Sequence, residues 1–196
     1  MRGGIFSSMA TTTGQMIAFL RAINLGKNRR FAMADLKECL VDAGFLDVET
    51  HLATGNVLLR SRMRSRARLE ERLEEVFQAR TGFAVPTIAV SPAELRAVHD
   101  AATALDLAAA RRYVTFVKEP LSAEARAEID AWDAPGEGAK ALDRAVIWWL
   151  DHPSQAAKFS NAKVERHAVA TTRDLKVVAT LAQRWGGAGG RAPTAT

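Results

Sequence analysis

The spacing of hydrophobic and polar positions predicts strands and helices in alternation along most of the chain. In the first half, apolar runs predict strands over 16–23, 47–52, 57–60 and 85–90, and stripes with helical period predict helices over 34–43 and 66–80. The turn sequence Thr54-Gly55-Asn56 separates two of the strands, which predicts a hairpin. The resulting order, β-α-β-β-α-β, is the ferredoxin-like arrangement.

The second half repeats this order with weaker signals. Ser91, Pro92 and Glu94 fit the N-cap, first turn and capping box of a helix that links the halves and runs through about residue 99. Beyond it, the pattern predicts strands over 112–117, 140–142 and 146–150, and helices over 122–132, 161–166 and 172–185. The central strands are nearly all apolar, so we expect helices on one face of the first sheet and the second half on the other.

These patterns predict an α+β protein of two ferredoxin-like subdomains, the second of them degenerate. We expect a disordered leader over 1–15, a first subdomain with its linking helix over 16–100, a second α+β subdomain over 111–185 and a flexible tail over 186–196. The sequence leaves open whether translation starts at Met1, Met9 or Met16.

Composition and charge narrow the functional classes. The 196 residues are 48% hydrophobic and 25% charged, which is typical of a globular protein. No apolar run approaches the roughly 20 residues of a membrane span, and Cys39 is the single cysteine, so an intramolecular disulfide is excluded and we expect a cytoplasmic protein. The net charge of +5 is mildly basic and is compatible with an anionic partner, either a small molecule or a nucleic acid, without requiring one.

The predicted topology brings the segment after the first strand next to the hairpin turn. This segment, 24–30, contains a glycine and three cationic side chains, and Lys and Arg suit phosphate or carboxylate groups. The candidate ligand-binding residues here are Arg21, Asn24, Gly26, Lys27, Asn28, Thr54, Gly55 and Asn56. The alternatives are a solvated loop for the basic segment, a structural ion pair for Arg21 and an ordinary turn for 54–56.

Further candidates come from two predicted helix starts in the second half. Ser160, Lys163, Thr172 and Arg173 could add donors to an anion site if the subdomains meet there. The alternative is helix capping alone, because Thr171 and Asp174 fit a capping box with Asp in place of Glu.

Other patterns favour structural interpretations. The alternating arginines of 60–68 have no aromatic residue among them and precede an acidic helix face, which favours a solvated surface at the opposite rim over a nucleic-acid track. The four histidines and one cysteine show no zinc-ligand spacing, and no dinucleotide or P-loop motif is present, so no metal or cofactor is predicted. One ring of Trp148-Trp149 should face each side of its strand.

Several of these segments also resemble the bacterial domain-of-unknown-function 1697 family. The resemblance rests on 19–28 with 33–36, then 43–48, 54–57 and 82–86, and later on 158–165 and 170–175, so it covers about 16–185. It implies two ferredoxin-like subdomains and no particular activity. The sequence departs from the family pattern at Ala22, where Gly is expected, at Thr54, where Ser is usual, and at Asp174, where Asn is usual.

The function expected from the sequence is binding of a phosphate-bearing ligand at this basic rim by an otherwise uncharacterised protein. One alternative is a transferase or hydrolase that acts on a phosphorylated small molecule, with His51 or Asp35 as the base. Another is a protein-interaction scaffold, which an exposed apolar patch would mark. The sequence leaves the catalytic residues and the oligomeric state open.

Overall fold

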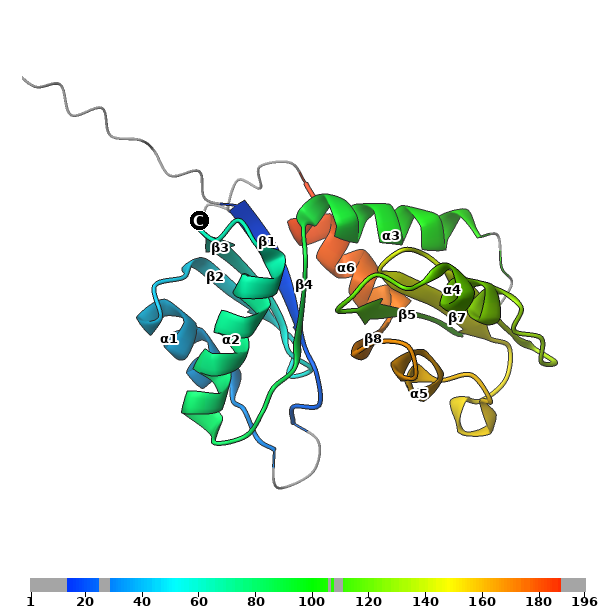
Figure 1. Cartoon of the computed structure of the whole chain (residues 1–196), viewed down its shortest axis with the longest axis horizontal. Helices are drawn as coiled ribbons and strands as arrows, with labels where there is room; N and C mark the ends of the chain where they lie inside the picture. Colours follow the sequence, from blue (N-terminus) through cyan, green and yellow to red (C-terminus); the bar gives the residue numbers. More distant parts are fainter. Residues whose placement is uncertain (1–13, 25–28, 106, 108–110, 188–196) are drawn as a thin grey trace, which may run out of the picture.

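A computed structural model describes residues 14–24, 29–105, 107 and 111–187 of the chain. Its strands form two four-stranded antiparallel sheets (Figure 1). The N-terminal sheet has the order β2-β3-β1-β4 and the C-terminal sheet the order β6-β7-β5-β8. Both orders are the ferredoxin-like order, so the predicted fold of two such subdomains is confirmed.

The first subdomain follows the predicted order of elements. Its elements are β1 (Gly14–Leu20), α1 (Met33–Asp42), β2 (Leu46–His51), β3 (Asn56–Ser61), α2 (Arg66–Thr81) and β4 (Thr87–Val90). The predicted strand over 16–23 ends earlier, because the backbone turns at Ala22, whose φ is 56°. Helix α3 (Pro92–Ala104) starts with the predicted capping box of Ser91 and Glu94 and is five residues longer than the pattern indicates.

The second subdomain contains a strand that the sequence pattern does not predict. Its elements are β5 (Arg111–Val117), α4 (Ala123–Asp130), β6 (Glu137–Ala141), β7 (Ala145–Leu150), a short 3-10 turn (Ser154–Ala156), α5 (Asn161–Glu165), β8 (Ala170–Asp174) and α6 (Leu175–Trp185). The prediction of helix over 172–174 is wrong, because these residues pair with β5. The predicted capping box is wrong as well: Asp174 itself is the N-cap, accepting from the Lys176 amide at 2.8 Å.

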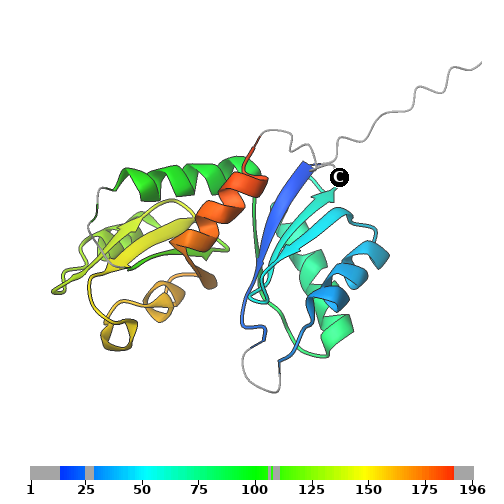
Figure 2. The ribbon, with the colours of Figure 1, turned by 180° about the vertical axis from the view of Figure 1, so that it is seen from behind.

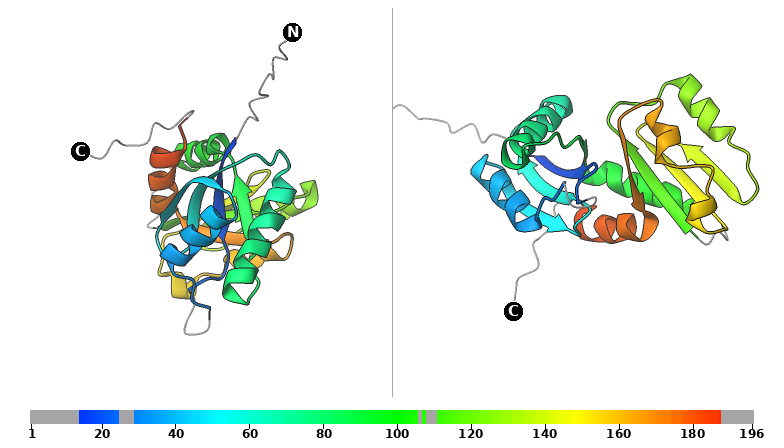
Figure 3. Two further views of the ribbon diagram at one scale, coloured as in Figure 1. Left: turned by 90° about the vertical axis from the view of Figure 1, so that its left-hand side faces the viewer. Right: turned by 90° about the horizontal axis from the view of Figure 1, so that it is seen from below.

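Each sheet has helices on its outer face, and a shared core fills the space between the two sheets. Helices α1 and α2 cover the outer face of the N-terminal sheet, where they face the viewer in the left view of Figure 3. On the inner face, Phe19 stacks on Phe116 of β5 with ring centroids 4.2 Å apart. Helices α3 and α6 join this shared core, and Figure 2 shows α6 running between the sheets. The expectation that the second half covers the first sheet is therefore confirmed.

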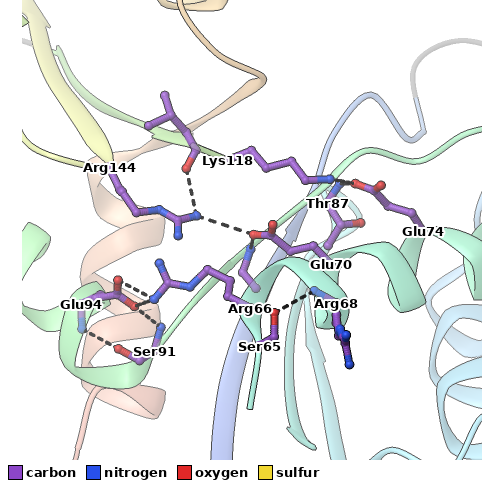
Figure 4. Close-up of polar contacts among 12 residues, drawn as sticks. Ser65, Arg66, Arg68, Glu70, Glu74, Thr87, Ser91, Glu94, Lys118 and Arg144 are labelled. Carbon is purple, nitrogen blue, oxygen red and sulfur yellow. Dashed lines mark hydrogen bonds and ion pairs between the residues drawn. The ribbon is translucent and has the colours of Figure 1, made fainter. Parts of the chain in front are cut away.

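The edge strand β4 has its outward N–H groups bound by acidic side chains of α2. The Glu70 carboxylate accepts from the Ala89 amide at 2.8 Å, and the Glu74 carboxylate accepts from the Thr87 amide at 2.8 Å (Figure 4). An edge strand otherwise presents free donors to other chains. These two carboxylates therefore end the sheet at β4.

Cations from the second subdomain face the same two carboxylates. Lys118 Nζ donates to Glu74 at 2.6 Å, and Arg144 Nη2 lies 3.6 Å from the Glu70 carboxylate (Figure 4). Burial raises the pKa of Glu70, which is 1% exposed, while the Ala89 amide and the Arg144 guanidinium act in the opposite direction. Interactions between opposite charges thus connect the two subdomains at one end of their interface.

Candidate functional site

The segment after β1 is folded around the side chain of Asn24. Its Nδ2 donates to the carbonyl oxygens of Phe31 at 3.0 Å and Ala53 at 2.7 Å, and its Oδ1 accepts from the Phe31 amide at 2.8 Å. The side-chain amide of Asn24 therefore closes the segment on itself and joins it to the hairpin turn between β2 and β3. The predicted adjacency of crossover and hairpin is confirmed, while Gly26, Lys27 and Asn28 lie outside the described residues.

Arg29 ties this segment to the start of β4. Its Nε donates to the Ala22 carbonyl at 2.7 Å and its Nη2 to the Ala84 carbonyl at 2.6 Å. The guanidinium also lies over the Phe83 ring, 4.6 Å from its centroid. Three parts of the chain that are distant in sequence therefore meet here: 21–24 with 29–31, the hairpin turn 52–56, and the approach to β4, 83–86. We refer to them together as the crossover rim.

The hairpin turn has a structural requirement for glycine. Gly55 has a φ of 77°, and a Cβ there would lie 2.8 Å from both Leu20 Cβ and Ile23 Cδ1. The neighbouring Asn56 is fully buried and donates from Nδ2 to the His51 carbonyl at 2.7 Å and to Thr54 Oγ1 at 3.2 Å. Gly55 and Asn56 thus build the turn, as the structural alternative expects.

Arg173 of β8 crosses from the second subdomain into this turn. It is 6% exposed, and its Nη2 donates to the carbonyl oxygens of Leu20, Thr54 and Gly55 at 2.9, 3.0 and 3.1 Å. Its Nε donates to Asn56 Oδ1 at 2.6 Å. The remaining contacts are made by Nη1, which donates to the Thr171 hydroxyl and the Thr172 carbonyl, both at 2.9 Å. The predicted ligand donor therefore has its N–H groups directed to acceptors of the protein itself.

The charge of Arg173 has no carboxylate against it within the described residues. Burial lowers the pKa of its guanidinium to about 10, so the group stays charged at neutral pH. Its counterparts are carbonyl dipoles and the face of Phe19, whose centroid lies 5.4 Å away. A buried cation that is balanced by dipoles alone raises the positive potential around it.

Arg21 makes the structural ion pair that the sequence leaves as an alternative. Its Nε donates to Glu165 Oε1 of α5 at 2.6 Å. No feature of the sequence identifies Glu165 as the partner of Arg21, because only the fold brings α5 to the end of β1. The other predicted residues of α5 lie differently: Lys163 contacts the Trp132 ring at 5.1 Å, and Ser160 is the N-cap without a side-chain capping bond. Residues two apart on a helix do not share a face, so Lys163 points away from Arg21.

Thr172 is part of a hydrogen-bonded row inside the second subdomain. Its hydroxyl donates to Asn161 Oδ1 at 2.9 Å and lies 2.7 Å from the Thr115 hydroxyl. Thr115 in turn accepts from the Trp148 indole at 3.0 Å. Thr172 therefore lies on the face of the C-terminal sheet opposite to Arg173 and does not join the crossover rim.

The candidate bases of the enzymatic alternative lie apart from these cations. Asp35 accepts from Arg80 of α2 at 2.8 Å, on the outer helical layer. The Nδ1 of His51 accepts from Arg184 Nη1 at 3.0 Å, and burial, with Arg184 as the second cause, lowers the pKa of the imidazole. Burial raises the pKa of the Cys39 thiol to about 11, which makes it a poor nucleophile. Within the described ranges, no group of three or more His, Cys, Asp or Glu could hold a metal ion.

The arginines of 60–68 lie at the other end of the N-terminal sheet. Arg60 pairs with Asp47 at 2.8 Å, and Arg66 pairs with both oxygens of Glu94 at 2.6 and 2.7 Å. The side chains of Arg62, Arg64 and Arg68 are exposed. Substitutions of these exposed arginines can therefore serve as controls for the removal of positive charge at the crossover rim.

Comparison with known proteins gives a family and a fold. The model of a family described as proteins of unknown function, DUF1697, matches residues 14–148. The chain belongs to the DUF1697 family. The matched range ends before the segments 158–165 and 170–175, which also resemble the family in sequence. None of the curated proteins matches this DUF1697 protein.

A solved structure has the same fold. The conserved bacterial protein SP0830 from Streptococcus pneumoniae is similar with a TM-score of 0.63 and 22% sequence identity, and the match covers 88% of this chain and 98% of that one. None of the described helices of this DUF1697 protein is long and apolar enough to cross a membrane.

Proposed function

We propose that this DUF1697 protein binds an anionic, phosphate-bearing small molecule at the crossover rim. The observation that carries the proposal is the pairing of two anchored guanidinium groups, those of Arg29 and Arg173, with carbonyl oxygens and aromatic rings instead of carboxylates. Their positive charge is held in place and is not neutralised by an acidic side chain of the described residues. A ligand with negative charge would supply the missing counter-charge.

The arrangement favours binding because the cations are held before a ligand arrives. Arg29 has two of its nitrogens on backbone carbonyls, which leaves Nη1 for a further contact. Arg30 follows directly and is exposed, and Lys27, outside the described residues, lies in the same segment by sequence. Preorganised donors cost less entropy on binding than flexible ones. We place this function in the cytoplasm.

The test removes charge from the rim without touching the anchors. In the variant Lys27→Gln, Arg30→Gln, two cations become neutral side chains of similar length, while Arg29, Arg173 and Asn24 stay. The matched control is Arg62→Gln, Arg64→Gln, which removes the same charge at the opposite end of the sheet. Isothermal titration with inorganic phosphate, ATP and a single-stranded oligonucleotide at low and moderate salt compares the three proteins.

We expect the wild type and the control to bind phosphate or ATP alike, and the rim variant to bind about tenfold or more weakly, because charge-assisted hydrogen bonds are lost. Equal affinity of the rim variant and the control would contradict the proposal, as would the absence of binding to the wild type. Tighter binding of the oligonucleotide than of ATP would shift the ligand class to nucleic acid.

A further inference from the structure

A buried ion pair connects the two subdomains outside the crossover rim. The carboxylate of Glu70, on α2, is 1% exposed, and Arg144, in the turn between β6 and β7, has its Nη2 at 3.6 Å from Oε1 of this carboxylate (Figure 4). The same oxygen accepts from the Ala89 amide of β4 at 2.8 Å. One carboxylate therefore interacts both with the edge strand of its own subdomain and with a cation of the other.

Arg144 has few hydrogen bonds for a guanidinium in this position. Its side chain is 16% exposed, its Nη2 donates to the Val117 carbonyl at 3.3 Å, and its Nε is buried without a partner among the described residues. Burial lowers the pKa of this guanidinium and Arg66 acts in the same direction, while Glu70 is the first of the carboxylates that act against both. A buried cation with so few hydrogen bonds requires an opposite charge nearby, which Glu70 supplies.

Two further cations in this cluster are paired with other carboxylates. Lys118, which follows β5, donates to Glu74 at 2.6 Å. Arg66, in the first turn of α2, donates to both oxygens of Glu94 at 2.6 and 2.7 Å. Arg144 is therefore the cation of the cluster that relies on the buried carboxylate.

Burial and the surrounding charges together set the protonation of Glu70. Burial is the largest effect and raises the pKa of this carboxyl group, whereas the Ala89 amide and the cations Arg144, Lys118 and Arg66 lower it. Because the net pKa is raised, the folded chain binds this proton at a higher pH than the unfolded chain does. Proton uptake by Glu70 alone therefore favours the folded state in this window of pH. The site can change its charge while the protein stays folded.

We propose that Glu70 and Arg144 form a proton-sensitive latch between the subdomains of this DUF1697 protein. In the closed state Glu70 is charged, Arg144 lies in the interface and the Ala89 amide is bound to a carboxylate. When Glu70 takes up a proton from solvent, the opposite charge is lost, and Arg144 moves outward beside the exposed carboxylate of Glu119. The Ala89 amide then has only a neutral acceptor, so the edge strand β4 opens more readily.

The experiment is NMR spectroscopy of the full chain between pH 4 and 8, on the wild type and three variants. Glu70→Gln imitates the neutral acid, Arg144→Gln removes the cation, and Glu71→Gln, at an exposed position of the same helix, is the matched control. Three signals are followed: the carboxyl carbon of Glu70, the Nε–H group of Arg144 and the hydrogen exchange of the Ala89 amide. The exchange rates are corrected for their intrinsic dependence on pH.

In the wild type, we expect the Ala89 amide to exchange about fivefold faster once Glu70 is protonated, because a hydrogen bond to a neutral acceptor is weaker than one to a charged acceptor. The Arg144 signal should move toward that of an exposed arginine with the same midpoint. Glu70→Gln should give the open-state values of both signals at every pH. In Arg144→Gln, the titration of Glu70 should move to higher pH, since a cation that lowers its pKa is gone. The control should behave as the wild type does.

The proposal fails if the Arg144 signal stays unchanged while Glu70 titrates, or if the Ala89 amide exchanges at the same rate in Glu70→Gln and Glu71→Gln. Faster exchange throughout both sheets would also overturn it, because acid would then unfold the whole protein. Circular dichroism verifies the fold of each variant. If Glu70→Gln does not fold, the titrations of the wild type and Arg144→Gln still decide the question.

Discussion

The Nη2 atom of Arg173, in β8, donates a hydrogen bond to the carbonyl oxygen of Leu20, the last residue of β1, at 2.9 Å. This bond joins a strand of the second subdomain to a strand of the first. It also places a buried positive charge where the crossover and the hairpin turn meet. At this point of the interface, one side chain therefore provides both a polar contact between the subdomains and a positive charge at the crossover rim.

Replacement of Arg173 by Met should destabilise the protein by roughly 3 kcal/mol or more. The substitution leaves the Leu20 carbonyl oxygen and the Asn56 amide oxygen buried without this donor, and each such group costs about 1–3 kcal/mol. Arg173→Lys should recover little, because one ammonium cannot reach acceptors on both sides of the fork. Urea denaturation followed by circular dichroism measures both. A loss below 1 kcal/mol for the Met variant would contradict this account.

Ala22→Gly should stabilise the protein by about 0.5–1 kcal/mol. Ala22 has a φ of 56°, a conformation that costs an L-residue about 1–2 kcal/mol, part of which the greater freedom of glycine in the unfolded chain offsets. This conformation also explains why glycine is expected at this position from the resemblance to the family. The matched control is Ala127→Gly in the exposed face of α4, which should lower stability by a similar amount. The same sign of change in both variants would be inconsistent with strain at Ala22.

The fold of the first subdomain could be predicted because its signals are local. The capping box at Ser91 and Glu94, the glycine of the hairpin turn and the apolar runs each fix one element, and the order of elements then fixes the sheet. The strand β8 could not be predicted in this way. Its sequence, Ala170–Asp174, is rich in threonine and ends in a helix cap, and only pairing with β5 makes it a strand.

The proximity of the crossover and the hairpin turn could be predicted, but the roles of the residues there could not. Topology alone brings the crossover next to the hairpin turn, as Asn24 and Ala53 demonstrate. The role of Arg173 depends on burial against the other subdomain, which no local pattern encodes. The same is true of Glu165, whose pairing with Arg21 spans 144 positions in sequence.

The stacked pair Phe19–Phe116 should couple the stability of the two subdomains. Its rings lie 4.2 Å apart across the shared core, and aromatic pairs contribute about 0.5–1.5 kcal/mol beyond the area that they bury. A double-mutant cycle of Phe19→Leu and Phe116→Leu, measured by urea denaturation, should give a coupling energy in this range. The control cycle combines Phe31→Leu with Phe116→Leu, because these residues belong to different cores. Its effects should add to within about 0.5 kcal/mol; a coupling as large as that of Phe19 would argue against direct stacking as the cause.

His51 should make the protein less stable as the pH falls below 6.5. Burial lowers the pKa of its imidazole below the ordinary histidine value of 6.5, and Arg184, whose Nη1 donates to Nδ1 at 3.0 Å, acts in the same direction. The unfolded chain then binds more protons than the folded one between the lowered pKa and 6.5, so stability decreases with decreasing pH in this window. In His51→Gln, the amide oxygen still accepts from Arg184 but does not titrate, so the slope between pH 5 and 7 should decrease. Urea denaturation at half-unit pH steps measures the slope, with His99→Gln as the control; an unchanged slope in His51→Gln would show that this histidine is not the responsible group.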